Sequence, residues 1–392
     1  MITGKASKEA TQARAERFGG YQSLGQTHLS VSSSGFGCYR VAIGQSSHER
    51  SLEQALIGGV NLIDTSSNYA DGLSEQMVGY VLGHMLKEGT LTREEVVLVS
   101  KVGYLQGQNY DMSQSRKKEG KPFPDLVELG PDLEHCLHPE FLEDQMDRSR
   151  ARLNCQCIDV YLLHNPEYYL DWAMQAGLSR AEADAEYYGR IALAFEFLEG
   201  EVAAGRISYY GISSNTFPHE QEKRNFTSLE KTWELACALS PNHHFRVIQF
   251  PMNLVERGAA VVVNQSQNRT LLDFCRDHKI GTLINRPLNA IVNGRLLRLA
   301  EVETYVPEAH PQFQAMVDQN QSIKNHIAHV DPNWADTSSL SSTAYRALRS
   351  TAGIHSVLVG MRHPDYVKDI LTEMGKPIEI HTRKDSWSAL KL

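Results

Sequence analysis

Eight short apolar runs alternate with amphipathic segments along most of the chain, and this alternation limits the possible folds more than any other feature. The runs cover residues 33–42, 61–66, 95–102, 158–164, 206–213, 245–251, 280–287 and 354–360. They are apolar throughout rather than at every second position, which is typical of parallel strands buried on both faces. The segments with helical periodicity cover residues 48–59, 73–86, 138–154, 191–205, 228–239, 269–279 and 363–374. Eight such units favour an α/β fold, a closed (β/α)8 TIM barrel, over an open doubly wound sheet.

Two polar stretches interrupt this rhythm, residues 104–137 after the third run and residues 289–350 after the seventh. Segments that follow barrel strands lie on the face formed by the strands' C-terminal ends, where TIM barrels carry their active sites. We therefore expect a single domain with long loops on that face, either walling a substrate pocket or solvated and without function. The predicted barrel spans residues 28–374, with an N-terminal extension over 1–27 and a tail over 375–392.

Charge and cysteine content narrow the classes of function. The 39 basic and 47 acidic residues give a net charge of −8, which argues against nucleic-acid binding. The six scattered cysteines and the absence of a long apolar segment indicate a reduced, cytoplasmic protein without membrane contact. The Cys155–Cys157 pair and the His135–His138 cluster each lack a matching second half elsewhere, so we expect no metal site.

Four polar residues stand out because they follow strands that are otherwise too apolar to hold them. Asp64, Lys101 and His164 lie at the ends of the second, third and fourth runs, and Tyr69 follows Asp64 by five residues. In a barrel the three strand-end residues share one rim, and Tyr69 can turn back over it. Taken singly, Asp64 also fits a helix cap, Lys101 a surface charge and His164 a core histidine.

Together, these four groups predict a proton-transfer site. A lysine ammonium beside a tyrosine stabilises the phenolate, so we expect Lys101 to lower the pKa of Tyr69. Asp64 would keep the ammonium charged and in place, and His164 would orient a substrate oxygen. The set indicates a phenolic acid that protonates a carbonyl oxygen while hydride reaches the carbon.

The same residues lie in three sequence motifs that resemble those of the aldo-keto reductases, NAD(P)(H)-dependent oxidoreductases on a (β/α)8 barrel. The motifs are NxIDTxxxYxxGxSE over 61–75, VxxxSKVG over 96–103 and IDVYLLH over 158–164. The resemblance covers roughly residues 28–374. It implies that Tyr69 is the proton donor, that Lys101 and Asp64 tune it, and that His164 positions the carbonyl. A small carbonyl or sugar substrate is expected, and its identity and the oligomeric state stay open.

The resemblance also implies a set of cofactor-binding residues. At the nicotinamide we expect Gly37, Cys38, Tyr39, Asp64, Ser213, Ser214, Asn215 and Gln249. At the pyrophosphate and adenosine end we expect Asn285, Arg286, Pro287, Leu288, Gly294, Leu296, Gly360, Met361, Arg362 and Tyr366. Arg362 could pair with a 2′-phosphate, which favours NADP(H) over NAD(H), although NAD(H) stays possible.

The chain departs from the family pattern on the cofactor side. Asn285 and Arg286 stand where many members have an aromatic residue that stacks on the nicotinamide, and Tyr366 and Ile370 replace an adenine-binding Gln and Asn. Three other functions stay open beside an NADPH-dependent carbonyl reductase. They are an NAD(P)⁺-dependent aldose dehydrogenase, a regulatory protein that binds the cofactor, and a metal-dependent hydrolase using Asp64 and His164.

Overall fold

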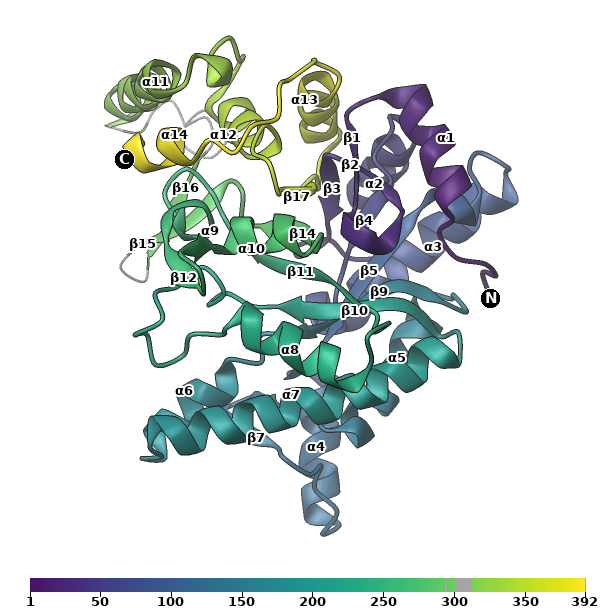
Figure 1. Ribbon diagram of the computed structural model, residues 1–392. Helices are drawn as coiled ribbons and strands as arrows, with labels where there is room; N and C mark the ends of the chain where they lie inside the picture. Colours follow the sequence, from purple (N-terminus) through teal and green to yellow (C-terminus); the bar gives the residue numbers. More distant parts are fainter. Residues whose placement is uncertain (293–294, 300–309, 311, 392) are drawn as a thin grey trace.

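The structure is a computed structural model that describes residues 1–292, 295–299, 310 and 312–391. Eight parallel strands close into a barrel in the order β3-β4-β5-β9-β10-β11-β14-β17 (Figure 1). The strands are β3 (Ser34–Gly37), β4 (Leu62–Asp64), β5 (Val97–Val102), β9 (Ile158–His164), β10 (Ile207–Ser213), β11 (Phe245–Pro251), β14 (Gly281–Asn285) and β17 (Ser356–Val359). Each apolar run identified in the sequence supplies one of them, so the predicted TIM barrel is confirmed.

Helices surround the barrel as an outer layer. They are α2 (Ser46–Ile57), α3 (Leu73–Lys87), α5 (Pro139–Arg152), α7 (Arg180–Ala203), α8 (Leu229–Leu239), α10 (Leu271–Asp277), α12 (Leu340–Arg349) and α13 (Pro364–Met374). α7 begins well before the expected residue 191, because Ser179 and Glu182 form a capping box that starts the helix at Arg180.

Two buried apolar clusters hold these layers together. Inside the barrel, Val99, Leu162 and Leu283 belong to a cluster that the strands share with Leu24 and Val31 from the N-terminal segment. A much larger cluster fills the space between the strands and the helices. The strand β9 faces both clusters and is buried at all seven positions, which explains why its sequence is apolar except at Asp159 and His164.

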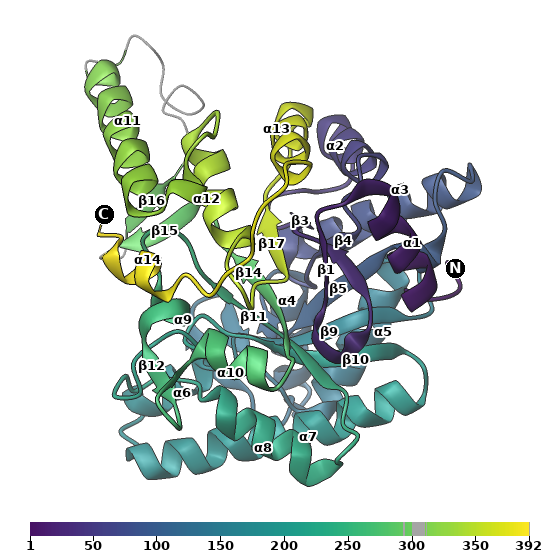
Figure 2. The same cartoon turned by 45° about the horizontal axis from the view of Figure 1, so that its top comes forward.

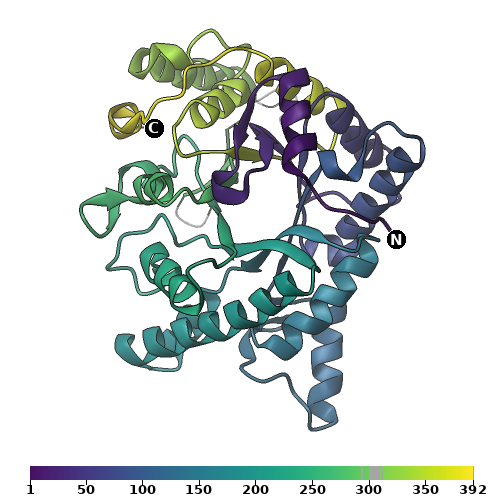
Figure 3. The ribbon, with the colours of Figure 1, turned by 45° about the vertical axis from the view of Figure 1, so that its right-hand side comes forward.

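The N-terminal segment packs against the barrel (Figure 3). It contains helix α1 (Lys8–Phe18), strand β1 (Tyr21–Ser23) and a short 3-10 helix, η1 (Gly25–Thr27), and β1 pairs antiparallel with β2 (Ser30–Ser32). The Ala6 amide donates to Asp159, a buried carboxylate in β9 that also pairs with Arg93. The predicted boundary at residue 28 thus falls between paired strands, and the domain limits stay a prediction.

The insertion after β5 is more regular than its polar sequence suggests. It contains β6 (Tyr104–Leu105), helix α4 (Gln108–Lys118), β7 (Val127–Gly130) and β8 (Leu133–His135). The strands form an antiparallel sheet in the order β6-β8-β7, and α4 extends away from the barrel (Figure 1). We refer to residues 104–137 as the β5 insertion.

The second insertion, after β14, lies at the opposite edge of the molecule (Figures 1 and 2). Its described parts are the hairpin of β15 (Asn289–Val292) and β16 (Arg295–Arg298), helix α11 (Phe313–Val330), the 3-10 helix η5 (Pro332–Trp334) and α12. The C-terminal segment carries α14 (Lys384–Ala389), and its buried Trp387 packs on Trp334 with ring centroids 5.0 Å apart.

The remaining elements are short. They are η2 (Tyr69–Gly72), η3 (Arg93–Glu95), α6 (Tyr168–Gln175), α9 (Gly258–Val261) and the paired strands β12 (Val263–Gln265) and β13 (Arg269–Thr270). Among the described helices, we find none with the length and hydropathy of a membrane span.

Candidate active site

The polar residues predicted at the strand ends lie on five adjacent strands of the barrel. Asp64 ends β4, Lys101 lies in β5, His164 ends β9, Ser213 ends β10 and Gln249 lies in β11. His164 and Ser213 are direct partners in the register of β9 and β10. The C-terminal rim of the barrel therefore brings the three strand-end members of the predicted tetrad together.

The fully buried ammonium of Lys101 is the centre of the site. Its Nζ donates to Asp64 Oδ2 at 2.8 Å, to the Thr65 carbonyl at 2.8 Å and to Tyr69 Oη at 3.1 Å. These contacts use all three hydrogens of the ammonium and fix its position. Burial lowers the pKa of Lys101, but the charge of Asp64 and the hydrogen bonds to Asp64 and Tyr69 outweigh that effect and raise it, so the amine stays charged.

A tight turn brings Tyr69 back over the rim, as expected. Ala70 and Asp71, the two residues after it, adopt left-handed backbone at φ 48° and 55°. Such backbone costs about 1–3 kcal/mol per residue and is typical of functional sites. The Tyr69 ring meets the His164 ring edge to face at 6.0 Å and the Tyr39 ring at 5.2 Å.

The pKa of Tyr69 differs from the sequence expectation. Burial raises it to about 12, and the nearby Lys101 ammonium lowers it only partly against that larger effect. The direction of the lysine's influence was predicted correctly, but the expected net decrease is wrong. The sequence identifies the charged neighbour and not the degree of burial. The Tyr69 phenol is consequently protonated at neutral pH.

His164 is a neutral imidazole in this environment. Burial lowers its pKa well below the usual value, and the positive Lys101 lowers it further. Its Nδ1 lies 3.1 Å from the hydroxyl of Ser66, and accepting from that hydroxyl leaves the hydrogen of the neutral ring on Nε2. A neutral imidazole can orient a substrate oxygen through a hydrogen bond without carrying charge into the site.

Ser213 and Gln249, predicted at the nicotinamide, join the tetrad through hydrogen bonds. Ser213 Oγ donates to Gln249 Oε1 at 3.1 Å, and Gln249 Nε2 donates to Asp64 Oδ1 at 2.8 Å. A primary amide has two N–H bonds, so Gln249 can keep this contact and still donate to a carboxamide. Asp64 therefore accepts from both Lys101 and Gln249. Burial nevertheless raises the pKa of Asp64.

The other predicted nicotinamide residues lie nearby but face different partners. Ser214 is buried, and its hydroxyl bonds Thr216 at 3.1 Å rather than the rim. The backbone N–H of Asn215 donates to Glu167 Oε1 at 2.7 Å. After β3, Gly37 and Cys38 lead to Tyr39, whose side chain is 65% exposed above Tyr69. Tyr39 is therefore placed to contact a ligand at the mouth of the site.

The residues predicted at the phosphates follow β14 and β17, which are neighbours in the barrel. Asn285 Oδ1 is buried and has no hydrogen-bond partner among the described residues. Arg286 pairs with Glu256 at 2.7 Å. The charge of its guanidinium is therefore already balanced by a carboxylate, and the guanidinium is not free for the phosphate contact predicted from the sequence. Pro287 is buried and Leu288 packs against the larger core cluster.

Near α13, Gly360 and Arg362 are exposed, Met361 is buried and Tyr366 is 36% exposed beside His363. No hydrogen bond or ion pair joins Arg362 to the described residues. Gly294 lies outside the described residues. Of Leu296 the structure describes only the backbone, in β16. The predicted phosphate end thus offers one guanidinium without a partner among the described residues, which fits an anionic group, and one unsatisfied buried amide oxygen, which fits a hydrogen-bond donor.

Sequence reasoning missed several groups that contact the site. Glu167 is 3% exposed and His135 1% exposed, and neither resembles a buried residue from its sequence context. Glu167 follows the fourth strand by three residues and could have been noticed as a carboxylate near the rim. His135 belongs to the polar β5 insertion and carried no such signal.

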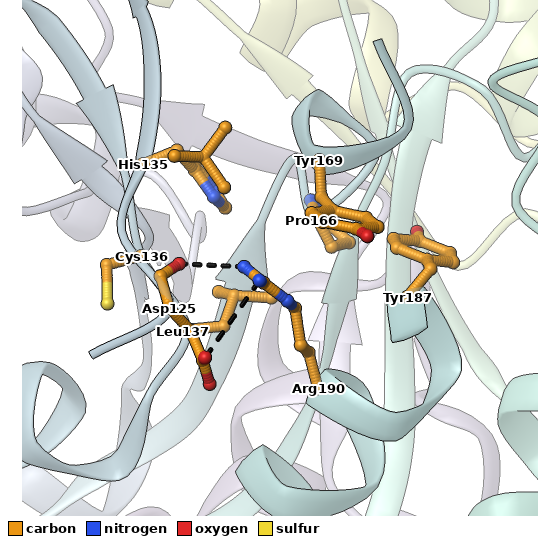
Figure 4. A pocket seen from close by; sticks show the side chains of 9 residues that line it. Asp125, His135, Cys136, Leu137, Pro166, Tyr169, Tyr187 and Arg190 are labelled. Carbon is orange, nitrogen blue, oxygen red and sulfur yellow. Dashed lines mark hydrogen bonds and ion pairs between the residues drawn. The ribbon is translucent and has the colours of Figure 1, made fainter. Parts of the chain in front are cut away.

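A small hollow between the β5 insertion and helices α6 and α7 is not the substrate site (Figure 4). It encloses about 10 Å³, room for one water molecule at most. Arg190 closes it by donating to the Asp125 carbonyl at 2.7 Å and lying 4.3 Å above the Tyr169 ring. These contacts pack the insertion against the barrel helices.

Within the described part of the chain, no group of three or more His, Cys, Asp or Glu side chains is arranged to hold a metal ion. Asp64 and His164 instead contact Lys101, Gln249 and Ser66. The closed barrel thus carries a buried Lys–Asp pair beside a rim tyrosine, an arrangement that can supply a proton from a phenol.

Comparison with known proteins gives the family. A sequence model of the Aldo/keto reductase family matches residues 35–382. The chain belongs to the aldo-keto reductase family and is an oxidoreductase, as its motifs predicted.

Individual relatives are distant. The NADH-specific methylglyoxal reductase of Escherichia coli (strain K12) is 23% identical over 293 residues, covering 72% of this chain and 71% of that enzyme. The NAD(P)H-dependent D-xylose reductase of Scheffersomyces stipitis is 24% identical over 186 residues. That match covers 46% of this chain and 48% of the xylose reductase.

Solved structures share the fold at low identity. The holo form of an aldo-keto reductase from Bacillus halodurans has a TM-score of 0.59 and 18% identity, with 95% of this chain and 96% of that chain covered. An aldo/keto reductase from Klebsiella pneumoniae, in complex with NADP and acetate, has a TM-score of 0.54 and 16% identity, with coverages of 92% and 91%.

Proposed function

We propose that the chain reduces an aldehyde or ketone with NADPH and that Tyr69 donates the proton. The observation that carries this proposal is the 3.1 Å contact between the buried Lys101 ammonium and Tyr69 Oη, with Asp64 on the other side of the amine. The raised pKa of Tyr69, about 12, keeps the phenol protonated at neutral pH. A protonated phenol is the form that reduction requires and oxidation does not.

When bound, the nicotinamide supplies hydride to the carbonyl carbon. Tyr69 gives its proton to the carbonyl oxygen, and negative charge develops on the phenolic oxygen. Lys101 stabilises that charge at close range, while Asp64 prevents the ammonium from moving away. Neutral His164, edge to face with Tyr69, orients the carbonyl oxygen. Ser213 and Gln249 hold the nicotinamide carboxamide.

One feature of the chain supports NADPH over NADH. Arg362 is exposed immediately before the residue that caps α13, and a guanidinium there can grip a 2′-phosphate bidentately. The relatives' names give different cofactors: the Escherichia coli enzyme is named NADH-specific and the Scheffersomyces stipitis enzyme NAD(P)H-dependent. The preference of this chain therefore depends on its own residues, and Arg362 is the one that favours the phosphate.

The substrates to try first come from the relatives' names. A 2-oxoaldehyde such as methylglyoxal and an aldose such as D-xylose are small carbonyl compounds that fit the proposed chemistry. The test begins with fluorescence titration by NADPH and NADH, followed by turnover of both compounds in both directions. Faster oxidation of the aldose than reduction of any carbonyl would favour the aldose dehydrogenase. Cofactor binding without turnover would favour a regulatory protein.

Tyr69→Phe tests the proton donor directly. We expect kcat for reduction to fall by about 10²–10⁴-fold while the NADPH dissociation constant stays the same, because the ring remains and only the acid is lost. Tyr80→Phe, at an exposed tyrosine on α3, is the matched control and should behave as wild type. Full activity in Tyr69→Phe would contradict the proposed role.

A further inference from the structure

The β5 insertion contacts the catalytic rim at the point where β9 ends. Tyr104 in β6 and His135 in β8 are direct cross-strand partners in the inserted sheet. Both are buried, and neither belongs to the barrel that supplies the tetrad. Their contacts reach two consecutive residues, His164 and Asn165.

The first contact fixes the backbone of His164. His135 Nε2 lies 2.8 Å from the His164 carbonyl oxygen. A carbonyl only accepts hydrogen bonds, so this nitrogen carries the hydrogen and donates. Burial lowers the pKa of His135 to about 4, so the imidazole stays neutral and keeps one tautomer at physiological pH.

The second contact fixes the residue that follows. The side-chain Nδ2 of Asn165 donates to Tyr104 Oη at 2.6 Å, and the backbone N–H of Asn165 donates to the Ser213 carbonyl at 2.7 Å. Asn165 adopts left-handed backbone at φ 50°, which ends the strand and turns the chain away. The Tyr104 ring also meets the His164 ring edge to face at 4.7 Å. The turn is therefore held from both the insertion and β10.

Gly103 shows how close this contact is. A Cβ at that position would lie 2.6 Å from His135 Nε2 and 2.7 Å from the His164 carbonyl oxygen, both shorter than real contacts. The glycine of the sequence word SKVG is thus required where the insertion approaches β9, two residues after Lys101.

We propose that Tyr104 and His135 are positioning residues that set the orientation of His164 toward the substrate. The proposal rests on the proposed carbonyl reduction, in which His164 orients the carbonyl oxygen. Neither residue needs to touch the substrate, because each acts on the backbone or the ring of His164. A segment outside the barrel thereby controls one member of the tetrad and leaves Lys101 and Asp64 to the barrel strands.

The experiment compares His135→Leu with His135→Gln in the full chain. The leucine removes the donor, whereas the glutamine amide places an N–H near the position of imidazole Nε2. We expect His135→Leu to lower kcat for methylglyoxal reduction by about 10–100-fold without changing the KM for NADPH, as a misplaced catalytic group does. His135→Gln should recover most of that loss. Tyr104→Phe, which removes the Asn165 contact, should lower kcat in the same direction.

A second readout does not depend on turnover. This readout is the NMR spectrum of protein isotopically labelled at its 16 histidines. The imidazole signal of His164 is identified by its absence from the spectrum of His164→Gln. We expect this signal to shift in His135→Leu and to return in His135→Gln. His355→Leu is the matched control, since half-buried His355 also has a pKa that burial lowers to about 4 but bonds Thr282 at the start of β14, far from the rim.

The two proposals fail in different ways. An unchanged His164 signal in His135→Leu, or an equal shift in His355→Leu, would overturn the positioning role. A shifted signal with no reduction of any carbonyl by the wild type would support the positioning role and overturn the proposed function alone.

Discussion

Glu167 provides the sharpest test of the electrostatics at this site. Its side chain is 3% exposed, and one carboxylate oxygen accepts from the Asn215 amide at 2.7 Å. The other oxygen, Oε2, is buried and has no hydrogen-bond partner among the described residues. Burial raises the pKa of Glu167 from 4.5 to about 7, against the lowering effect of the amide contacts. The perturbation to make is Glu167→Gln, which keeps the acceptor for Asn215 and removes the titration.

The sign and size of the effect follow from linkage. In the unfolded chain the carboxyl loses its proton near pH 4.5, whereas in the folded chain it loses it near pH 7. The contribution of Glu167 to folding stability is therefore full below pH 4.5 and is lost as the pH rises through 7. The difference between the two pKa values corresponds to about 3 kcal/mol. Relative to wild type, Glu167→Gln should gain about that much stability between pH 4.5 and 8.

Urea unfolding of both proteins at pH 4.5, 6, 7 and 8 measures this gain, because all other titrating groups cancel in the comparison. Glu199→Gln is a control of opposite sign. Hydrogen bonds from His244 and Tyr210 outweigh burial and lower the pKa of Glu199 below its usual value of 4.5, so that variant should be less stable than wild type by pH 6 and show no further loss between pH 6 and 8. Parallel pH curves for wild type and Glu167→Gln would refute the reasoning and show that the carboxyl titrates normally.

Three further predictions concern the tyrosine, the cofactor and the fold. With the pKa of Tyr69 raised to about 12, substrate oxidation should accelerate by up to about tenfold per pH unit between pH 7 and 9, whereas reduction should change little. Steady-state rates in both directions would show this. Arg362→Ala should weaken NADPH binding far more than NADH binding in fluorescence titrations, and equal losses would remove Arg362 from the phosphate. Asp159→Asn should cost about 3–5 kcal/mol in chemical unfolding, because it leaves buried Arg93 without its partner.

The barrel and its rim could be predicted because both depend on local sequence patterns. Each barrel strand is a continuous apolar run, and one polar residue at its end necessarily faces the C-terminal rim. The positions of Asp64, Lys101 and His164 followed from counting strands. Ser213 and Gln249 followed from the family words, and the structure links them to Asp64.

The β5 insertion could not be predicted in the same way. Its strands are two to four residues long, and polar residues such as Glu134 and His135 are buried in them by partners elsewhere in the chain. Glu134, for example, accepts from Ser113 and Lys117 of α4. Periodicity is not visible over so few residues, so the segment was expected to be loop.

The environment of a titratable group is the least predictable feature for a related physical reason. The sequence places Lys101 near Tyr69, and this correctly gives one contribution to the pKa of the phenol. Burial, which is larger and opposite in sign, depends on segments that are far apart in sequence. Glu167 shows the same dependence, since its partner Asn215 lies 48 positions away.

The proposed proton-transfer group and the residues proposed to position His164 thus lie in different parts of this chain. The Lys101–Asp64–Tyr69 group is built from two barrel strands and one turn, and its hydrogen bonds leave little freedom to vary. His164 ends strand β9 and is also held by a carbonyl contact and a ring contact from the β5 insertion. Changes in that insertion can therefore alter how a carbonyl is oriented while the proton donor stays intact.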